Sequence, residues 1–391
     1  MSQSLQGRKV VMAVWGSLRH DARVLRAATT VHEAGAELVV VAASWRAEEL
    51  GEHRDERGFR VVTVARPTPW KEMNRQPGLW AAIKRAFELL PSGIGFMRAM
   101  RRERADLYHA HDIQALPWTW LAARGRPYIY DAHEISTDGT AYTRIARFVS
   151  RLESFFARRA AAMITTTDMR ADHFVEAYGV GRPVVVQNRP FYRAAPRSNR
   201  LREALGLDAS VPVFLYQGGL QAGRGLESII DAAAGVAGVH FAFLGPGILR
   251  DDLMARARER GVIERVHFLE AVPFEELPAW TASADVGLQL LENIGLNHYS
   301  TDSNKIFEYG MAGLPVIASD FPEIRKIVES ADFGLLVDPA DIEAIRAAMI
   351  RLRDDAGLRR RFAENALRQG RALSFDTEAP KLLGVYERIS Q

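Results

Sequence analysis

Two stretches in the second half of the chain combine residue types that bind phosphate and sugar hydroxyls. The first, QGGLQAGRGLES at residues 217–228, directly follows the apolar run VFLY. Its glycines let the backbone approach a ligand closely, and the helix expected after it presents free amide hydrogens. Arg224 adds a forked donor that suits phosphate oxygens. Because turns need glycine anyway, Arg224 is the residue that favours a diphosphate-binding loop over an ordinary turn.

The second stretch is SNKIFEYGMAGLPVIAS, residues 303–319, in which a glutamate interrupts an apolar sequence. We expect Ser303 to be the N-cap of a helix that ends at Gly313 and leads into a buried strand. Free amides at a helix start favour anions, so this end could hold a phosphate while Glu308 reaches a neutral polyol such as ribose. Lys305 lies three residues before Glu308, so a local ion pair is an equally open interpretation.

In the first half of the chain, two pairs of a histidine and a carboxylate follow apolar runs. His111 and Asp112 come after DLYHA, and His133 and Glu134 come after PYIYDA. A lone histidine is more often structural than catalytic, but two pairs at equivalent strand ends favour a functional role.

The elements that must position these residues follow a regular order. Runs of β-branched residues alternate with helix-period segments almost from end to end, which is typical of parallel sheets built from βαβ units. Residues 188–200 break the pattern with two prolines and no periodicity. We therefore predict two doubly wound, parallel-sheet, Rossmann-like α/β domains that face a central cleft lined by strand-to-helix loops. The predicted domains are residues 1–190 and 200–375, with residues 376–391 forming a C-terminal helix that packs back toward the first domain.

Length and composition agree with this organisation. The chain has 391 residues, too many for one hydrophobic core, and its 48% hydrophobic and 25% charged residues are ordinary for a globular protein. It has no Cys, which excludes disulfides and thiolate metal sites. The N-terminus lacks the pattern of a signal peptide, and no apolar run approaches the ~18 residues that span a bilayer. We expect a cytoplasmic protein, with a peripheral position at the inner face of a membrane left open.

The charge is distributed unevenly. Residues 1–200 carry a formal charge of about +11, which leaves about −8 of the net +3 for the rest. This asymmetry suggests that the first half meets an anionic membrane face or a phosphate-bearing substrate, with unbalanced solvated surfaces as the alternative. Residues 79–104 mix aromatic and basic side chains as interfacial amphipathic segments do, and ordinary packing on the first sheet is the alternative. Nucleic acid is not expected, because the basic residues are dispersed and no stacking motif accompanies them.

The motifs also resemble a known family. The segment SNKIFEYGMAGLPVIASDFPEI resembles the donor-site segment of family 4 glycosyltransferases, and YQGGLQAGRGLESII resembles the family's loop of glycines and Lys or Arg. Further similarity lies in VHFLEAVPFEELPAWTASADVGL, DARVLRAATTVHEAGAELVVVA, YHAHDIQALP and YIYDAHE, so the resemblance covers nearly the whole chain. It implies the GT-B fold, an acceptor-side first domain, a second domain that binds a nucleotide sugar, and retention of anomeric configuration.

The resemblance assigns roles to individual residues. It implies that Glu308 accepts hydrogen bonds from the ribose hydroxyls of a sugar nucleotide and that Arg224 binds the diphosphate. The implied donor-binding residues are Gly218, Gly219, Arg224, Gly245, Val272, Ser303, Asn304, Lys305 and Glu308. His111 matches the family's His near the transferred sugar. With Arg224 it is a predicted catalytic residue, and the positions of Asp112, His133 and Lys305 at strand ends and a helix start add them as candidates. The candidates that face the acceptor are Asp21, Arg23 and Glu134.

Two positions depart from the family's pattern. Many members have a second Arg where this chain has Gly219. The family's paired glutamates, with seven residues between them, would place a carboxylate at Ser300, eight positions before Glu308. The residues that could contact the donor sugar instead are Ser300, Thr301, Asp302 and Glu292.

Together these features predict a hexosyltransferase-type, retaining glycosyltransferase. It would move a sugar from a nucleotide-sugar donor, best UDP-linked, to a glycan or lipid-linked acceptor in cell-envelope or exopolysaccharide synthesis. No cofactor and no metal is expected, since the chain has no DxD motif and no convincing spacing of His and carboxylate ligands. A sugar-nucleotide-binding protein without turnover and a nucleotide-sugar 2-epimerase are the alternatives. The sequence leaves open the base, the sugar, the acceptor, the linkage and the oligomeric state.

Overall fold

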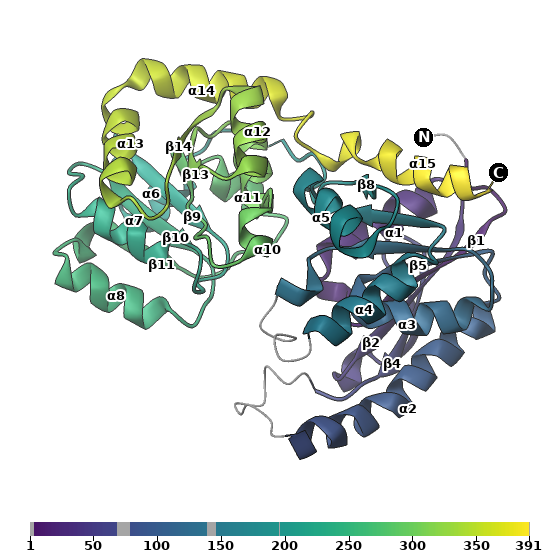
Figure 1. Ribbon diagram of the computed structural model, residues 1–391. Helices are drawn as coiled ribbons and strands as arrows, with labels where there is room; N and C mark the ends of the chain where they lie inside the picture. Colours follow the sequence, from purple (N-terminus) through teal and green to yellow (C-terminus); the bar gives the residue numbers. More distant parts are fainter. Residues whose placement is uncertain (1–3, 69–78, 139–145, 195, 391) are drawn as a thin grey trace. The chain divides into compact units, whose positions relative to one another are not determined.

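The computed structural model describes residues 4–68, 79–138, 146–194 and 196–390. The chain divides into two compact units, and the C-terminal residues belong to the first one. Unit 1 comprises Met1–Gln187 and Glu378–Gln391, and unit 2 comprises Asn188–Thr377. Each unit carries its own β-sheet with helices on its faces (Figure 1).

The sheet of unit 1 has the strand order β3-β4-β2-β1-β5-β6-β7-β8. Seven strands run parallel, as the alternating pattern predicts, and most of their residues are buried, which suits strands covered on both faces. They are β1 (Lys9–Val14), β2 (Glu37–Ser44), β4 (Arg60–Ala65), β5 (Leu107–His111), β6 (Tyr128–Ala132), β7 (Ala162–Thr165) and β8 (Val184–Val185).

The eighth strand departs from the predicted parallel sheet. Strand β3 (Gly51–Arg54) pairs antiparallel with β4 at the sheet edge. Its four residues, GEHR, are all exposed, so they carry neither the apolar run nor the alternation by which a strand is identified. Backbone pairing with β4, rather than burial of side chains, therefore defines this strand.

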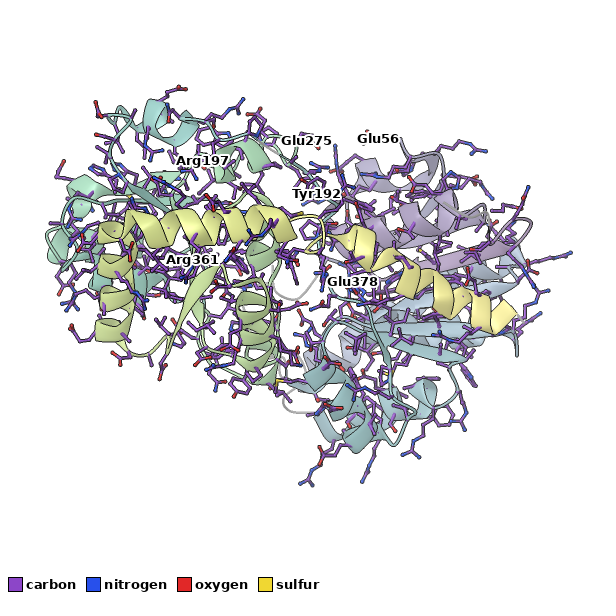
Figure 2. All side chains as sticks on the ribbon, turned by 90° about the horizontal axis from the view of Figure 1, so that it is seen from above. Glu56, Tyr192, Arg197, Glu275, Arg361 and Glu378 are labelled. Carbon is purple, nitrogen blue, oxygen red and sulfur yellow. The ribbon has the colours of Figure 1, made fainter. Side chains whose placement is uncertain are left out.

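The helices of unit 1 include one that returns from the far end of the sequence. Helix α15 (Ala379–Ser390) lies beside α1 and β8 (Figure 1). The buried Glu378 at its start, labelled in Figure 2, accepts a hydrogen bond from the backbone N–H of Gln187 at 2.9 Å. The other helices are α1 (Ala22–Glu33), α2 (Leu79–Glu103), α3 (Asp112–Ala123), α4 (Ala146–Ala157) and α5 (Asp168–Tyr178).

Helix α2 contains the segment predicted to be interfacial. In its second half Phe96 and Met100 are fully buried, and Phe96 packs edge-on against Trp15 with ring centroids 5.2 Å apart. This half of the helix therefore belongs to the core of unit 1. The aromatic side chains of Trp80 and Phe87, on which the interfacial interpretation also rests, lie outside the described residues. None of the helices that the structure describes is both long and apolar enough to cross a membrane.

The sheet of unit 2 is entirely parallel over the described strands, with the order β11-β10-β9-β12-β13-β14. The strands are β9 (Val213–Gln217), β10 (His240–Leu244), β11 (Val266–Leu269), β12 (Val286–Gln289), β13 (Val316–Ser319) and β14 (Gly334–Val337). The helices are α6 (Arg200–Leu205), α7 (Leu226–Ala233), α8 (Arg250–Glu259), α9 (Leu277–Thr281), α10 (Leu296–Tyr299), α11 (Asn304–Met311), α12 (Pro322–Ala331), α13 (Ile342–Asp354) and α14 (Ala356–Gln369).

Each sheet has a switch point at which the strand order reverses. In unit 1 it lies at β1, which pairs with β2 on one side and β5 on the other. In unit 2 it lies at β9, which pairs with β10 and β12. Ligands of doubly wound sheets bind beyond the carboxyl ends of the strands at such points. Most of the predicted site residues of both units follow strands at or next to these switch points, and His133, Glu134 and Val272 follow strands one position further along the sheets.

Candidate active site

The glycine loop of unit 2 follows β9 and packs closely on its surroundings. Gly218 has φ +124°, and a Cβ placed there would lie 2.8 Å from Lys305 Cε. Gly245, after β10, has φ +141°, and its Cβ would lie 2.4 Å from the carbonyl oxygen of Gly218. The Tyr216 hydroxyl donates to the carbonyl of Gly219 at 2.9 Å. These glycines are therefore needed for both backbone conformation and close packing.

Two cations lie at this loop. Burial, helped by the positive charge of Arg224, lowers the pKa of Lys305 to about 8, although the charge of Glu308 acts in the opposite direction. The Lys305 ammonium lies 5.2 Å from the centroid of the Tyr216 ring. Within the part of the chain that the structure describes, neither Lys305 nor Arg224 forms an ion pair with a carboxylate. The region thus concentrates two positive charges, and the nearby carboxylate of Glu308 acts on Lys305 without forming an ion pair with it.

Glu308 is held by a partner that the sequence did not suggest. Gln217, the last residue of β9, donates from Nε2 to Glu308 Oε2 at 2.6 Å. Gln217 is itself fixed, because its Oε1 accepts from Thr281 Oγ1 at 2.8 Å and its backbone N–H donates to the Tyr309 hydroxyl at 3.1 Å. Glu308 and Lys305 therefore have different contacts, Gln217 and the Tyr216 ring, so the interpretation of Glu308 as the partner of a local ion pair is not needed to explain its position.

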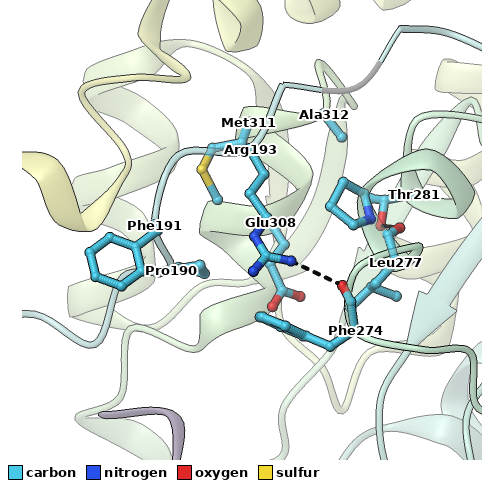
Figure 3. A pocket seen from close by; sticks show the side chains of 10 residues that line it. Pro190, Phe191, Arg193, Phe274, Leu277, Thr281, Glu308, Met311 and Ala312 are labelled. Atoms are coloured by element: carbon cyan, nitrogen blue, oxygen red, sulfur yellow. Dashed lines mark hydrogen bonds between the residues drawn. The ribbon is translucent and has the colours of Figure 1, made fainter. Parts of the chain in front are cut away.

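Glu308 also lines a largely apolar pocket within unit 2 (Figure 3). The pocket encloses about 360 Å³ including its opening to solvent. Arg193 lies over the Phe274 ring at 4.4 Å from the centroid and donates to the Phe274 carbonyl at 3.4 Å. The remaining lining residues are Pro190, Phe191, Leu277, Pro278, Thr281, Met311 and Ala312. An apolar wall beside an oriented carboxylate suits a ligand with one flat face and hydroxyl groups.

The predicted donor-sugar residues in the loop before α11 differ in burial and in hydrogen-bond partners. Ser300 and Asp302 are buried, while Thr301 is half-buried and accepts from the backbone N–H of Ser303 at 3.3 Å. Glu292 accepts from the N–H of Gly225 at 3.2 Å, and so holds the start of α7. Ser303 is the N-cap residue of α11 as predicted, but with φ 51° its side chain makes no capping hydrogen bond.

The two remaining predicted donor residues lie at loop and helix starts. Val272 is half-buried in the loop after β11, and Asn304 is the first residue of α11.

Gln289 is a further residue that the sequence did not indicate. It ends β12, beside the switch strand β9, and is 1% exposed. Neither polar atom of its side-chain amide has a hydrogen-bond partner among the described residues. A buried amide without partners costs about 1–3 kcal/mol, so this side chain is a candidate ligand contact at the same sheet edge.

In unit 1 the predicted histidines lie next to a buried ion pair between Arg23 and Asp131. Arg23 donates from Nε and Nη2 to both carboxylate oxygens of Asp131, at 3.0 and 2.8 Å, and from Nη1 to the carbonyl of Val186 at 2.9 Å. Burial alone would raise the pKa of Asp131, but the charges of Arg23 and His133 overcome it and hold this pKa well below its usual range. Asp131 is therefore an anion around which the histidines are arranged.

His133 is the charged histidine of this cluster. Its Nδ1 lies 3.1 Å from Asp112 Oδ2, and its backbone N–H donates to Asp112 Oδ1 at 2.9 Å. Burial alone would lower the pKa of His133, but Asp112 and Asp131 outweigh it and raise that pKa to about 10. Asp112 itself has φ 62°, a strained conformation for a non-glycine residue that these bonds maintain.

This charge fixes the proton on the neighbouring histidine. His111 Nδ1 lies 3.2 Å from His133 Nε2. Burial lowers the pKa of His111, so its ring is neutral, whereas both nitrogens of the His133 imidazolium carry protons. His133 Nε2 lies closer to His111 Nδ1 than to Asp131 Oδ2, which is 3.7 Å away, although His111 Nδ1 is itself 3.6 Å from that oxygen. Donation from His133 to His111 Nδ1 places the His111 proton on Nε2. That Nε2 is buried and has no partner among the described residues, so it can donate to a ligand.

The predicted acceptor-side residues do not form one surface. Arg23 is only 6% exposed and binds Asp131, so its expected contact with an acceptor is replaced by a structural role. Asp21 caps α1 by accepting from the N–H of Val24 at 3.0 Å, and its charge also acts on His111. Glu134 is exposed.

One group of described residues could by spacing hold a metal ion. Ligand atoms of His109, His111 and Asp131 all lie within 4.8 Å of one another. Both oxygens of Asp131 already accept from Arg23, and the His133 cation is adjacent. A divalent cation would have to displace or face these two positive charges, which disfavours a metal here.

Comparison with known proteins agrees with this architecture. The family model described as "Glycosyl transferase 4-like domain" matches residues 20–189, and the model described as "Glycosyl transferases group 1" matches residues 211–355. The chain is 28% identical to the alpha-D-kanosaminyltransferase of Streptomyces kanamyceticus, over 75% of this chain and 80% of that protein. It is also 28% identical to a GDP-mannose-dependent phosphatidylinositol monomannoside mannosyltransferase of Mycolicibacterium smegmatis, over 80% of each.

Solved structures show the same fold. Sucrose-phosphate synthase from Thermosynechococcus elongatus superposes with a TM-score of 0.79 at 17% identity, over 98% of this chain and 99% of that one. Anabaena HepE, solved in complex with UDP and glucose, superposes with a TM-score of 0.76 at 18% identity, over 97% of this chain and all of that one. The chain therefore belongs to the family 4 glycosyltransferases, hexosyltransferase-type enzymes with the two-domain GT-B fold.

Proposed function

We propose that this glycosyltransferase is a retaining enzyme that takes a hexose from a UDP-linked donor bound by unit 2. The observation that carries the proposal is the pair of cations Lys305 and Arg224, which form no ion pair with a described carboxylate and lie near the carboxylate of Glu308 that Gln217 orients. A nucleoside diphosphate offers the matching groups, two phosphates and a ribose diol. The complex of Anabaena HepE with UDP and glucose supports this choice of donor.

In this proposal each donor group has a partner in unit 2. The ribose hydroxyls donate to Glu308, whose carboxylate Gln217 orients, and the base lies against the apolar pocket near Val272 and Phe274. The diphosphate lies at Gly218 and Gly219, where no side chain intervenes, beside Arg224, Lys305 and the start of α11. The hexose extends toward the loop that contains Ser300, Thr301 and Asp302, with Gln289 as a further contact.

The same residues supply the main catalytic effect. Negative charge develops on the diphosphate as the glycosidic bond breaks, and Arg224, Lys305 and the amides at Ser303 and Asn304 stabilise it electrostatically. For retention we favour front-face attack, in which the departing phosphate oxygen takes the proton of the acceptor hydroxyl. His111 would donate from Nε2 to a sugar hydroxyl, with His133 and Asp112 holding its orientation.

For the acceptor we propose a glycan or a lipid-linked glycan of the cell envelope, bound by unit 1. Relatives named for phosphatidylinositol mannosides and for the lipopolysaccharide core support this class. The formal charge of about +11 in residues 1–200 would favour an anionic acceptor or a peripheral contact with an anionic membrane. In α2 the exposed basic residues Arg98 and Arg102 fit such a contact, whereas the buried Phe96 does not.

A binding protein without turnover is the second candidate. It is favoured by Ser300 and Gly219, which stand where many family members have charged groups. The two candidates share the donor site but differ in whether the bound sugar is ever transferred.

Donor binding is tested first, by thermal shift with a panel of UDP-, GDP-, ADP- and dTDP-sugars. We expect UDP-sugars to raise Tm, and Glu308→Ala and Arg224→Ala to remove most of the increase. The matched controls Glu329→Ala and Arg361→Ala change exposed residues of unit 2 and should keep the increase in Tm. Equal stabilisation of the two site variants would contradict the proposed donor site.

Transfer is tested next, with the best donor and a set of envelope glycans and glycolipids. NMR of the product should show the anomeric configuration of the donor. An inverted product would contradict retention, and tight donor binding without transfer or hydrolysis would favour the binding protein. A changed sugar without an acceptor would identify an epimerase.

A further inference from the structure

The C-terminal helix places a tyrosine against the histidine cluster of unit 1. Tyr386, on α15, is fully buried, and its hydroxyl lies 2.6 Å from His109 Nδ1. The two rings meet edge to face, with centroids 5.8 Å apart. His109 in turn stacks on His111, with centroids 4.1 Å apart and planes 28° from parallel. A continuous chain of contacts thus connects α15 to the ring that we assign to the sugar.

The direction of the bond between Tyr386 and His109 follows from the surrounding charges. Burial holds the pKa of His109 well below its usual range, so the ring is neutral and has one N–H. Its Nε2 lies 3.9 Å from Asp131 Oδ2, and this anion favours the proton on Nε2. Nδ1 is then the acceptor, and the Tyr386 hydroxyl donates to it.

Loss of this donor would disturb His111 in one of two ways. His109 Nδ1 would be left as a buried acceptor without a donor, which the ring could relieve by flipping or by taking up a proton. A flip would turn an N–H away from Asp131, and a proton would place a cation against His111. The charged groups that act on these two rings are Asp131, Arg23, His133 and Asp21, and Asp112 acts on His133.

We propose that Tyr386 is a positioning residue for His111, because its hydroxyl fixes the tautomer and the orientation of the His109 ring on which His111 stacks. The inference rests on the proposed role of His111 in glycosyl transfer. It goes further by giving the C-terminal helix a part in the reaction, although Tyr386 itself touches no substrate.

The test compares Tyr386→Phe with Tyr128→Phe in the full chain. Tyr128 is also buried in unit 1, but its hydroxyl donates to the backbone carbonyl of Phe156, away from the histidines. We expect Tyr386→Phe to lower kcat about tenfold with an unchanged KM for the UDP-sugar, since misplacement of a reacting group costs rate rather than donor binding. The acidic limb of its pH–kcat profile should move to higher pH. Tyr128→Phe should change neither.

A second readout does not depend on activity. NMR of 15N-histidine-labelled protein distinguishes the two neutral tautomers and the imidazolium. The wild type should show His109 protonated on Nε2 alone, and Tyr386→Phe should show a second tautomer or the cation. If Tyr386→Phe fails to fold, His109→Asn serves instead, because its Oδ1 can still accept from Tyr386 while the ring beneath His111 is lost. This variant should then show the same fall in kcat.

The outcomes separate the inference from the function on which it rests. If Tyr386→Phe matches Tyr128→Phe in kcat, pH profile and histidine tautomers, while His111→Ala abolishes transfer, the inference fails and the proposed function stands. If His111→Ala transfers at the wild-type rate, both the role of His111 and this inference fail.

Discussion

The two candidate regions differ in how their charges are balanced. In unit 1 the buried charges are paired within the protein: Arg23 with Asp131, and His133 with Asp112. In unit 2 the cations Lys305 and Arg224 form no ion pair with a described carboxylate, and burial of Lys305 makes its charge costly. The charges of the first region are thus balanced by ion pairs within the protein, whereas the cations of the second region would be paired by a bound anion.

This difference explains why the two regions would respond differently to a ligand. A prearranged cluster such as that around His111 can orient a reacting group without further change. A buried cation without a partner gains the most when a diphosphate arrives, because the anion restores the stability of its charged form. We therefore expect binding energy to come mainly from unit 2 and orientation of the reacting groups mainly from unit 1.

The largest effect should follow removal of the unbalanced charge. Lys305→Met should lower kcat/KM for glycosyl transfer about 10²- to 10³-fold, because one electrostatic contact to the developing charge is lost. Lys326→Met is the control, since that lysine pairs with Glu323 on α12, and it should remain near wild type. Steady-state kinetics with the best UDP-sugar measures both. A loss of less than threefold in Lys305→Met would show that the diphosphate is bound elsewhere.

The next effect concerns the pH dependence of donor binding. The pKa of Lys305 is about 8 in the free protein and should rise when a diphosphate binds, so binding is linked to proton uptake. The affinity for UDP should be constant below pH 8 and fall by about tenfold per pH unit above it. Calorimetry at pH 7, 8 and 9 measures this slope, and Lys305→Met should flatten it. A slope that persists in Lys305→Met would assign the proton to another group.

A smaller effect is expected in unit 1, where the pKa of the charged group is raised rather than lowered. The pKa of His133 is raised to about 10, so its contribution to stability is complete below pH 6.5 and is lost as pH rises through 10. Hydrogen exchange of peptides from β6, corrected for intrinsic rates, should show about 1–3 kcal/mol less protection at pH 10 than at pH 7. Asp112→Asn should reduce this difference, and Asp172→Asn, at an exposed ion pair, should not.

Unit 2 provides an internal comparison in the same experiment. The lowered pKa of Lys305 imposes a penalty that is complete below pH 8 and is relieved as pH rises toward 10.5. Peptides from α11 should therefore gain protection over the interval in which peptides from β6 lose it. Parallel losses in both units would contradict the difference in charge balance.

Metal removal should have the smallest effect. Because Arg23 and His133 surround Asp131, we expect dialysis against EDTA to leave transfer unchanged. The sharper control is added Zn²⁺, which should not restore or raise activity. A fall in activity on dialysis that Zn²⁺ reverses, and that is absent in His109→Asn, would instead assign a metal to His109, His111 and Asp131.

Much of the fold follows from local sequence patterns. The apolar runs of β9, β10 and β13 and the alternation of strands with helices predict parallel sheets, because strands covered on both faces must be apolar throughout. The exposed strand β3 escapes this reasoning, since only its pairing with β4 makes it a strand. Sequence reasoning therefore finds elements defined by burial and misses those defined by backbone pairing alone.

The candidate site divides in the same way. The sequence by itself determined which groups could meet a sugar nucleotide: Arg224 in a glycine loop, Glu308 on a helix, and histidines at strand ends. Only the tertiary structure decided their states, by setting Gln217 against Glu308, Asp131 beneath the histidines, and Tyr386 from the far end of the chain against His109. The physical reason is that residue type and spacing specify chemical capacity, whereas pKa, tautomer and orientation depend on burial and on neighbours that are distant in sequence.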